Sequence, residues 1–271
     1  MLKKIVIPVD FGNGAKAAYY YAQQMTANSP AEIYLIHILN PEKSGQNVNE
    51  AIALKDLQDF ATQNKVGVLK NPNNGLHTSI LKGSYQDCIQ AFCDSYNCDM
   101  MILGRRDKHS LMDRVLGSIG SKIAEQSTCP VLIIPEHILE AQFKNILYAT
   151  DHNSIQLGKL QSVLNLIRHF GSKLHFIHIN AFVNENTLLK NNVLSILCHD
   201  GIPIVPFVYK EFKSEHIATT LKEYSKEQNI DLVILSPNQE HSIWEKWTHS
   251  ISQDLIHFSQ QPMLILNKKK L

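Results

Sequence analysis

The chain has 271 residues, of which 44% are hydrophobic and 19% charged, a composition typical of a packed protein with room for two domains. Its formal net charge of +1 excludes a general electrostatic nucleic-acid binder. No apolar run approaches the ~20 residues of a membrane span, and the first residues, MLKKIVIPVD, lack the features of a signal peptide. We therefore predict a cytoplasmic protein that contacts neither nucleic acid nor membrane.

Strand-like and helix-like segments alternate along the first half of the chain. The expected strands are Lys3–Val9, Glu32–Leu39, Leu76–Leu81, Asp99–Leu103 and Val131–Ile134. The expected helices are Gly12–Ala27, Asn49–Asn64, Tyr85–Tyr96 and a further helix that begins near Gly117 and ends near Ser127. In the second helix we expect an inner face of Ile52, Leu54, Leu57, Phe60 and Ala61. This alternation predicts a parallel sheet with helices on both faces.

The second half repeats the first. Lys4–Asp10 (KIVIPVD) recurs 141 residues later as NILYATD, and Leu35–Ile38 (LIHI) recurs at the same offset as FIHI. Asp99–Leu103 (DMMIL) recurs 132 residues later as DLVIL, and CPVLI recurs at that offset as QPMLI. The period is too long for a solenoid, whose units have ~20–50 residues. We therefore predict two tandem domains, residues 1–138 and 139–271, with the joint near 136–143.

The five cysteines predict buried or half-buried free thiols. Cys88, Cys93 and Cys98 are spaced by five residues, which does not place their side chains on one helix face. No CxxC pair occurs, so the sequence contains no ligand framework for zinc or thioredoxin chemistry.

A glycine-containing loop follows the expected fourth strand and is the best functional lead. It reads GRRDKHSLMDRVLGSIGSKIAEQSTCPVLIIP, in which a basic segment precedes a helix start at Gly117-Ser118. Backbone amides at a helix start, together with the positive end of the helix dipole, favour a bound phosphate.

The strand that ends in Asp10, the loop spacing and the closing segment resemble the universal stress protein family. In that family a glycine, two residues, a second glycine and nine residues precede Gly-Ser or Gly-Thr, and here Gly104, Asp107 and Gly117-Ser118 occupy these places. The resemblance covers nearly the whole chain as two copies. It implies two doubly wound, Rossmann-like α/β domains, each with a five-stranded parallel sheet, that form an internal pseudo-dimer through their last strands. It also allows a homodimer.

The resemblance further implies an adenine-nucleotide site in the first domain. ATP-binding members of the family hold adenosine beside the aspartate of the first strand and the end of the second, with the triphosphate over the glycine loop. Carried over to this sequence, and with the basic residues of the loop added as phosphate partners, the expected ligand is ATP with magnesium, and the site residues are Asp10, Ile38, Leu39, Gly104, Arg105, Arg106, Gly117 and Ser118.

Two departures from the family pattern limit this prediction. Asp107 replaces the second glycine, and a carboxylate ~6 Å from a phosphate charge costs about 3 kcal/mol at an effective dielectric of ~20. The second copy has Ser236, Gln239 and His249-Ser250 at the loop positions, so no glycine remains there. We therefore expect nucleotide in the first domain alone, and Asp151 to be a strand-end or helix-capping residue.

Other readings of the sequence remain open. A protein that does not bind nucleotide, and uses the degenerate loops as a protein or small-ligand surface, is the alternative. No acid–base pair is identifiable, so we expect no enzyme, or at most slow ATP hydrolysis. The motif GNGAKA at 12–17 fits a loose dinucleotide fingerprint but also a simple turn into a helix. His37 and His178 occupy matching places in the two copies, which favours hydrogen-bonded histidines beside each core over catalysis.

Overall fold

A computed structural model describes residues 3–40, 49–65, 75–106, 127–150, 157–180, 187–199, 202–214, 216–236 and 260–266. This described part divides into two compact units, within residues 3–141 and 142–266. Strands and helices alternate in both units, and the strands of the main sheet that pair within each unit are parallel, so the predicted α/β fold class is confirmed. Within the described residues, no helix combines the length and hydropathy that crossing a membrane requires.

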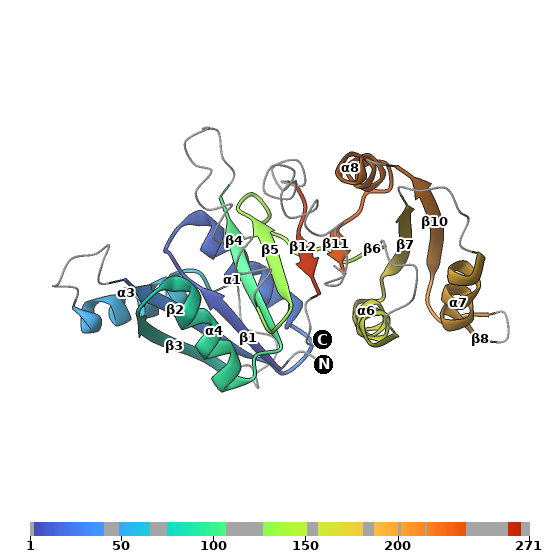
Figure 1. Ribbon diagram of the computed structural model, residues 1–271. Coiled ribbons are helices and arrows are strands. Elements are labelled where there is room, and N and C mark those ends of the chain that lie inside the picture. Colours follow the sequence, from blue (N-terminus) through green and yellow to red (C-terminus); the bar gives the residue numbers. More distant parts are fainter. Residues whose placement is uncertain are drawn as a thin grey trace. The chain divides into compact units, whose positions relative to one another are not determined.

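The described part of the first unit contains five strands in the order β3-β2-β1-β4-β5 (Figure 1). The strands are β1 (Lys4–Pro8), β2 (Glu32–Leu39), β3 (Gly75–Lys82), β4 (Met100–Arg105) and β5 (Val131–Pro135). Its described helices are α1 (Asn13–Met25), α3 (Glu50–Gln63) and α4 (Tyr85–Tyr96). All neighbouring strands in this order are parallel. The strand order reverses between β1 and β4, where sheets of this kind open a crevice at their carboxyl ends.

The helices of the first unit cover both faces of its sheet. Tyr19 of α1 and Phe60 of α3 have ring centroids 6.4 Å apart, so these two helices share a face. Phe92 of α4 instead contacts Tyr34 of β2, with centroids 5.7 Å apart. His37 of the same strand contacts the α1 side through Phe11, and side chains three apart on a strand point to opposite faces. Helix α4 therefore lies opposite α1 and α3.

The inner face of α3 differs from the prediction near its amino-terminal end, where Ile52 is exposed, Leu54 is half-buried and Ala53 is buried instead. Ile52 is 59% exposed, whereas Ala53, Leu57, Phe60 and Ala61 are buried. The buried residues follow a spacing of four, seven and eight, which is the period of a helix stripe, and Ile52 lies beside that stripe. The prediction assigned Ile52 to the inner face from its hydrophobicity alone and was wrong for this residue.

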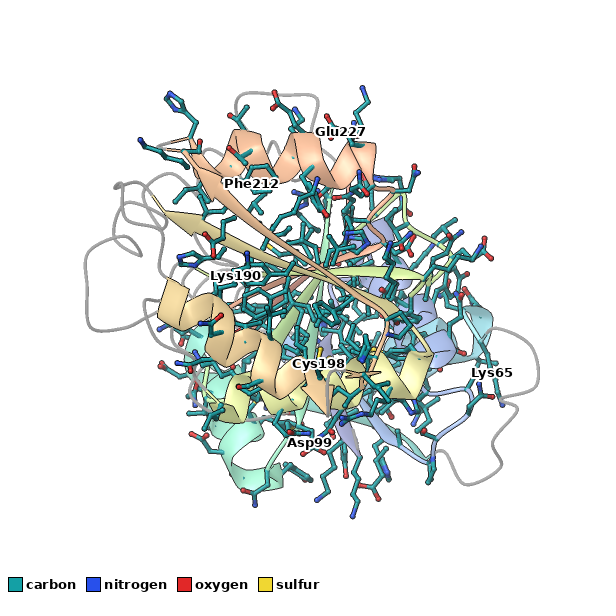
Figure 2. All side chains as sticks on the ribbon, turned by 90° about the vertical axis from the view of Figure 1, so that its right-hand side faces the viewer. Lys65, Asp99, Lys190, Cys198, Phe212 and Glu227 are labelled. Carbon is teal, nitrogen blue, oxygen red and sulfur yellow. The ribbon has the colours of Figure 1, made fainter. Side chains whose placement is uncertain are left out.

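The described part of the second unit repeats the topology of the first, with the strand order β10-β7-β6-β11-β12. Its strands are β6 (Asn145–Thr150), β7 (Lys173–Asn180), β10 (Phe207–Lys213), β11 (Leu232–Leu235) and β12 (Met263–Ile265), and its helices are α6 (Leu157–Phe170), α7 (Thr187–Leu197) and α8 (Ile217–Glu227). Phe212 of β10 packs against Tyr224 of α8 with ring centroids 5.7 Å apart. Figure 2 labels Phe212 on β10 and Glu227 at the end of α8. A short antiparallel hairpin, β8 (Cys198–His199) and β9 (Ile202–Pro203), was not predicted because two-residue strands leave no periodic pattern.

The cysteines occupy the environments that the sequence predicted. Cys93, Cys98 and Cys129 are buried, whereas Cys88 and Cys198 are half-buried, and all five are free thiols. The Sγ atoms of Cys93 and Cys129 lie 3.9 Å apart. Hydrogen bonds with the thiols of Cys129 and Cys98, followed by burial, raise the pKa of Cys93, so this thiol is protonated at neutral pH.

Candidate functional site

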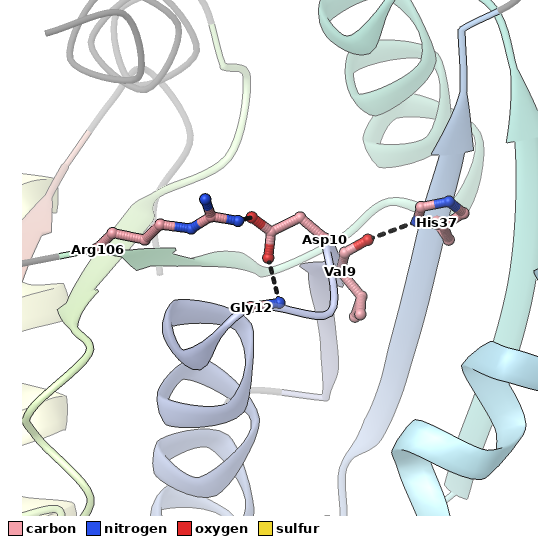
Figure 3. Close-up of polar contacts among 5 residues, drawn as sticks. All are labelled: Val9, Asp10, Gly12, His37 and Arg106. Carbon is pink, nitrogen blue, oxygen red and sulfur yellow. Dashed lines mark hydrogen bonds and ion pairs between the residues drawn. The ribbon is translucent and has the colours of Figure 1, made fainter. Parts of the chain in front are cut away.

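The carboxylate of Asp10 connects the ends of β1 and β4. Its Oδ1 accepts a hydrogen bond of 2.9 Å from the backbone amide of Gly12, which forms a tight turn before α1. Its Oδ2 accepts a charge-assisted hydrogen bond of 2.8 Å from Nη2 of Arg106, the first residue after β4 (Figure 3). The side chains of Arg106 and Asp10 are 50% and 48% exposed, so both remain accessible to a ligand.

Gly12 provides the space in which the guanidinium lies. A Cβ atom at Gly12 would be 3.0 Å from Nη2 of Arg106 and 3.1 Å from Oδ1 of Asp10. Helix α1, which begins at the next residue, has no side-chain cap and no acidic residue in its first turn. A carboxylate, a guanidinium and the positive end of a helix dipole therefore meet at the reversal of strand order.

Two glycines bring the first turn of α1 against β4. A Cβ atom at Gly104 would be 1.9 Å from the carbonyl oxygen of Gly14, and a Cβ atom at Gly14 would be 3.0 Å from the carbonyl carbon of Gly104. The absence of a side chain at Gly104 is thus required for packing inside the unit. Because β4 occupies the surface of Gly14, this glycine is not open to a pyrophosphate, and the GNGAKA motif is better explained as a turn and a packing contact.

Phe11 and His37 hold the turn that presents Asp10. Phe11 has a φ of 62°, a left-handed conformation that is strained for a bulky residue. Its ring compensates by packing against His37 and Phe60, with centroids 4.6 and 5.9 Å away. Nδ1 of His37 donates to the carbonyl oxygen of Val9 at 2.7 Å (Figure 3). In the second unit Nδ1 of His178 makes the matching bond to the carbonyl oxygen of Thr150 at 3.2 Å, which confirms the prediction of hydrogen-bonded histidines.

Tyr85, which the sequence did not predict as a site residue, begins α4 and is affected by the charge of Asp10. Burial and the negative charge of Asp10 raise the pKa of Tyr85, so the phenol is neutral and within electrostatic reach of that carboxylate. The amide of Gly83 donates to the carbonyl oxygen of Leu39 at 3.0 Å, which ties the start of α4 to the end of β2. The signal available in the sequence was Gly83-Ser84, a strand end followed by a helix cap that places the next residue at the carboxyl edge.

The other predicted site residues are placed as follows. Leu39 is buried at the end of β2, next to the half-buried Ile38. Arg105 is half-buried within β4 and its carbonyl oxygen accepts from the amide of Glu136 at 2.8 Å, so its backbone is held in the sheet. Gly117, Ser118, Asp107 and Asp151 lie outside the described residues. Within the described ranges, no group of three or more His, Cys, Asp and Glu side chains has an arrangement suited to a metal ion.

Comparison with known proteins points to one family. Residues 1–135 match the family model described as the universal stress protein family. Universal stress protein MJ0531 of Methanocaldococcus jannaschii is 26% identical over 148 residues, which cover 49% of this chain and 82% of that protein.

Two solved structures share the fold over almost the whole chain. A universal stress protein from Archaeoglobus fulgidus gives a TM-score of 0.74 at 16% identity, with 97% of this chain and 96% of that chain covered. The cytoplasmic domain of a prokaryotic cation chloride cotransporter gives a TM-score of 0.53 at 12% identity, with 100% of this chain and 98% of that chain covered. At these identities the likeness concerns the fold alone.

Proposed function

Because the chain is a member of the universal stress protein family through residues 1–135, we propose that its first unit binds an adenine nucleotide and that the protein acts in stress-response signalling through this binding. The proposed site is the carboxyl edge of β1, β2 and β4. The proposed domains are residues 1–138 and 139–271, with nucleotide in the first alone.

The observation that carries this proposal is the meeting of Asp10 and Arg106 where the strand order reverses. A carboxylate accepts hydrogen bonds from the amino and hydroxyl groups of a nucleoside, and a guanidinium donates a fork of hydrogen bonds to phosphate oxygens. Ile38 and Leu39 at the end of β2 would supply the apolar contact for the base, and Tyr85 a neutral phenol beside Asp10. In the proposed site, complementary groups for both ends of a nucleotide therefore lie on one edge of the sheet.

ATP with magnesium is the proposed form of the ligand. Magnesium in nucleotide sites is held largely by the phosphates of the substrate, so the protein need not supply a complete set of ligands. In the proposed complex Gly117 and Ser118 contribute backbone amides and a hydroxyl to the phosphates. Arg106 offsets the negative charge of Asp107.

A second candidate function is a module that binds another protein or a small ligand other than a nucleotide. The similarity in fold to the cotransporter domain supports this second function, because it shows that the same fold also occurs in part of a membrane transporter. Under this function the Asp10–Arg106 pair would be a structural link between β1 and β4.

Calorimetric titration of the purified chain with ATP and magnesium distinguishes the two functions. We expect binding to the unaltered protein and a loss of affinity of about tenfold or more in Asp10→Ala, since a charge-assisted hydrogen bond is removed. Asp59→Ala removes the same charge from an exposed position on α3 and serves as the matched control. Mass spectrometry of small molecules released on denaturation provides an independent readout. Absence of binding to the unaltered protein would favour the second function.

A further inference from the structure

The two charged groups of the proposed site bind each other. Oδ2 of Asp10 accepts from Arg106 at 2.8 Å, and Oδ1 accepts from the amide of Gly12 at 2.9 Å. Both oxygens of the carboxylate therefore have a partner within the first unit. A ligand that uses the outer oxygen of Asp10 must compete with Arg106 for it.

The strength of this pair is small enough for a ligand to displace it. Both side chains are about half exposed, and exposed ion pairs contribute a factor of roughly two to five in an equilibrium constant. A phosphate group offers the guanidinium a stronger, bidentate partner than the pair provides. Arg106 therefore gains by exchanging Asp10 for a phosphate, whereas a ligand without phosphate offers it no new partner.

The surrounding contacts allow this exchange without disturbing the fold. The Gly12 amide keeps hold of Asp10 when Arg106 leaves, so the carboxylate stays aimed at the ligand. Gly12 has no side chain to confine the guanidinium. Arg105, in contrast, pairs with Pro135 in the sheet register and cannot shift its backbone without breaking the ladder.

From this geometry we infer that Arg106 determines the preference of the site for nucleotides over nucleosides. The inference rests on the proposed function. The affinity for a nucleoside is lowered by the full free energy of separating Arg106 from Asp10, because a nucleoside offers the guanidinium no new partner. A nucleotide releases the carboxylate for its nucleoside portion and binds the released guanidinium through its phosphate. The side chain of Arg106 thus weakens the binding of adenosine and strengthens the binding of its phosphorylated forms.

Titration of adenosine, AMP and ATP into Arg106→Ala tests the inference. Adenosine should bind about two- to fivefold more tightly than to the unaltered protein, because Asp10 is no longer occupied. AMP and ATP should bind about tenfold or more weakly, because a charge-assisted contact to phosphate is lost. The ratio of the adenosine to the ATP dissociation constant should therefore fall by about twentyfold or more.

Two further variants separate charge from geometry. Arg106→Lys retains the charge without the planar fork and should lie between the unaltered protein and Arg106→Ala. Lys55→Ala removes one positive charge from an exposed position on α3 and should leave the ratio unchanged. Equal thermal unfolding midpoints would show that the exposed pair can be removed without loss of the fold.

The outcomes distinguish this inference from the proposed function. If the unaltered protein binds ATP and Arg106→Ala weakens adenosine and ATP by the same factor, the inference is wrong and the nucleotide site stands. An adenosine affinity unaffected by loss of Arg106 is equally against it. If the unaltered protein binds none of the three ligands, the proposed function fails and the inference fails with it.

Discussion

The two units use the same contacts at the amino ends of their strands. The amide of Asp99 donates to the carbonyl oxygen of Lys4 at 2.9 Å, and the amide of Asp231 donates to that of Asn145 at 2.8 Å. Each aspartate also accepts from the start of the first strand in its unit, Asp99 from Lys3 and Lys4 and Asp231 from Asn145. These bonds explain why the aspartate of DMMIL and DLVIL recurs in the sequence.

The carboxyl ends differ. In the first unit Gly104 allows α1 to touch β4, and Asp10 pairs with Arg106 beyond it. The second unit has Ser236 at the repeat position of Gly104, with its side chain buried at 3% exposure. The comparison indicates that the contacts that specify the fold lie at the amino edge and are common to both copies. Among the described contacts at the edge where α/β sheets bind ligands, the Asp10–Arg106 pair and the Gly104–Gly14 contact lie in the first unit, whereas the bond of His37 to Val9 recurs in the second unit as that of His178 to Thr150.

The largest test of this difference is Gly104→Ser, which transfers the residue of the second unit to the first. A Cβ atom 1.9 Å from the carbonyl oxygen of Gly14 forces α1 away from β4, so we expect a loss of about 3 kcal/mol or more in the free energy of unfolding. The reverse change, Ser236→Gly, should cost about 1 kcal/mol or less. Urea unfolding followed by circular dichroism measures both. Similar losses in the two variants would mean that the units do not differ at this contact.

Acid should weaken the second unit through His175, whose counterpart in the repeat is Tyr34. Burial, followed by the charges of Lys173 and Lys210, lowers the pKa of His175 to about 4 in the folded protein. Between pH 6.5 and 4 the unfolded chain binds a proton that the folded protein does not, so stability falls as the pH falls, by about 3 kcal/mol in total.

A pH series of urea titrations followed by circular dichroism measures this loss. His175→Phe removes the titrating group and should flatten the dependence between pH 6.5 and 4. A slope that survives this substitution would assign the acid sensitivity to another group.

Substitution of Asp99 and Asp231, the aspartates that recur in the two units, should have smaller effects on stability. Asp99→Ala removes the acceptor of the Lys3 and Lys4 amides and should cost about 2 kcal/mol, whereas Asp231→Ala removes the acceptor of the Asn145 amide and should cost about 1 kcal/mol. The Asn variants keep a side-chain oxygen and should recover part of each loss. Thermal unfolding of the four variants checks the order. If the substitution in one unit caused almost no loss of stability, the contact at the amino edge would not stabilise both units.

The smallest expected effect concerns two asparagines that follow the carboxyl ends of α4 and α8. Asn97 and Asn229 both have left-handed backbones, with φ values of 51° and 48°. Asn97→Ala and Asn229→Ala should each cost about 1 kcal/mol, because a Cβ next to the carbonyl oxygen is unfavourable there and alanine lacks the local hydrogen bonds of asparagine. The glycine variants should be nearly neutral. Differential scanning calorimetry resolves such shifts, and a larger loss with glycine than with alanine would contradict the backbone explanation.

Much of the fold could be predicted because its signals are local or repeated. The apolar runs predicted the five strands of the first unit, and the observed bounds, for example Gly75–Lys82 against the expected Leu76–Leu81, differ by about one residue at each end. Ile52 was misplaced because hydrophobicity was given more weight than its position around the helix. Of the residues predicted for the site, Asp10 and Arg106 contact each other at the carboxyl edge, whereas Gly117 and Ser118 lie outside the described residues.

The sequence by itself determined the alternation of strands and helices, the duplication and the strand-end residues, since each depends on neighbours in the chain or on a repeat that can be counted. Only the tertiary structure decided that Arg106 binds Asp10 across 96 residues, that Gly104 packs against Gly14, and that the charge of the same carboxylate contributes to raising the pKa of Tyr85. These contacts join separate segments, and their geometry follows from the strand order β3-β2-β1-β4-β5, which no local pattern encodes. Pairing between distant segments is set by packing, and packing exists only once the sheet has formed.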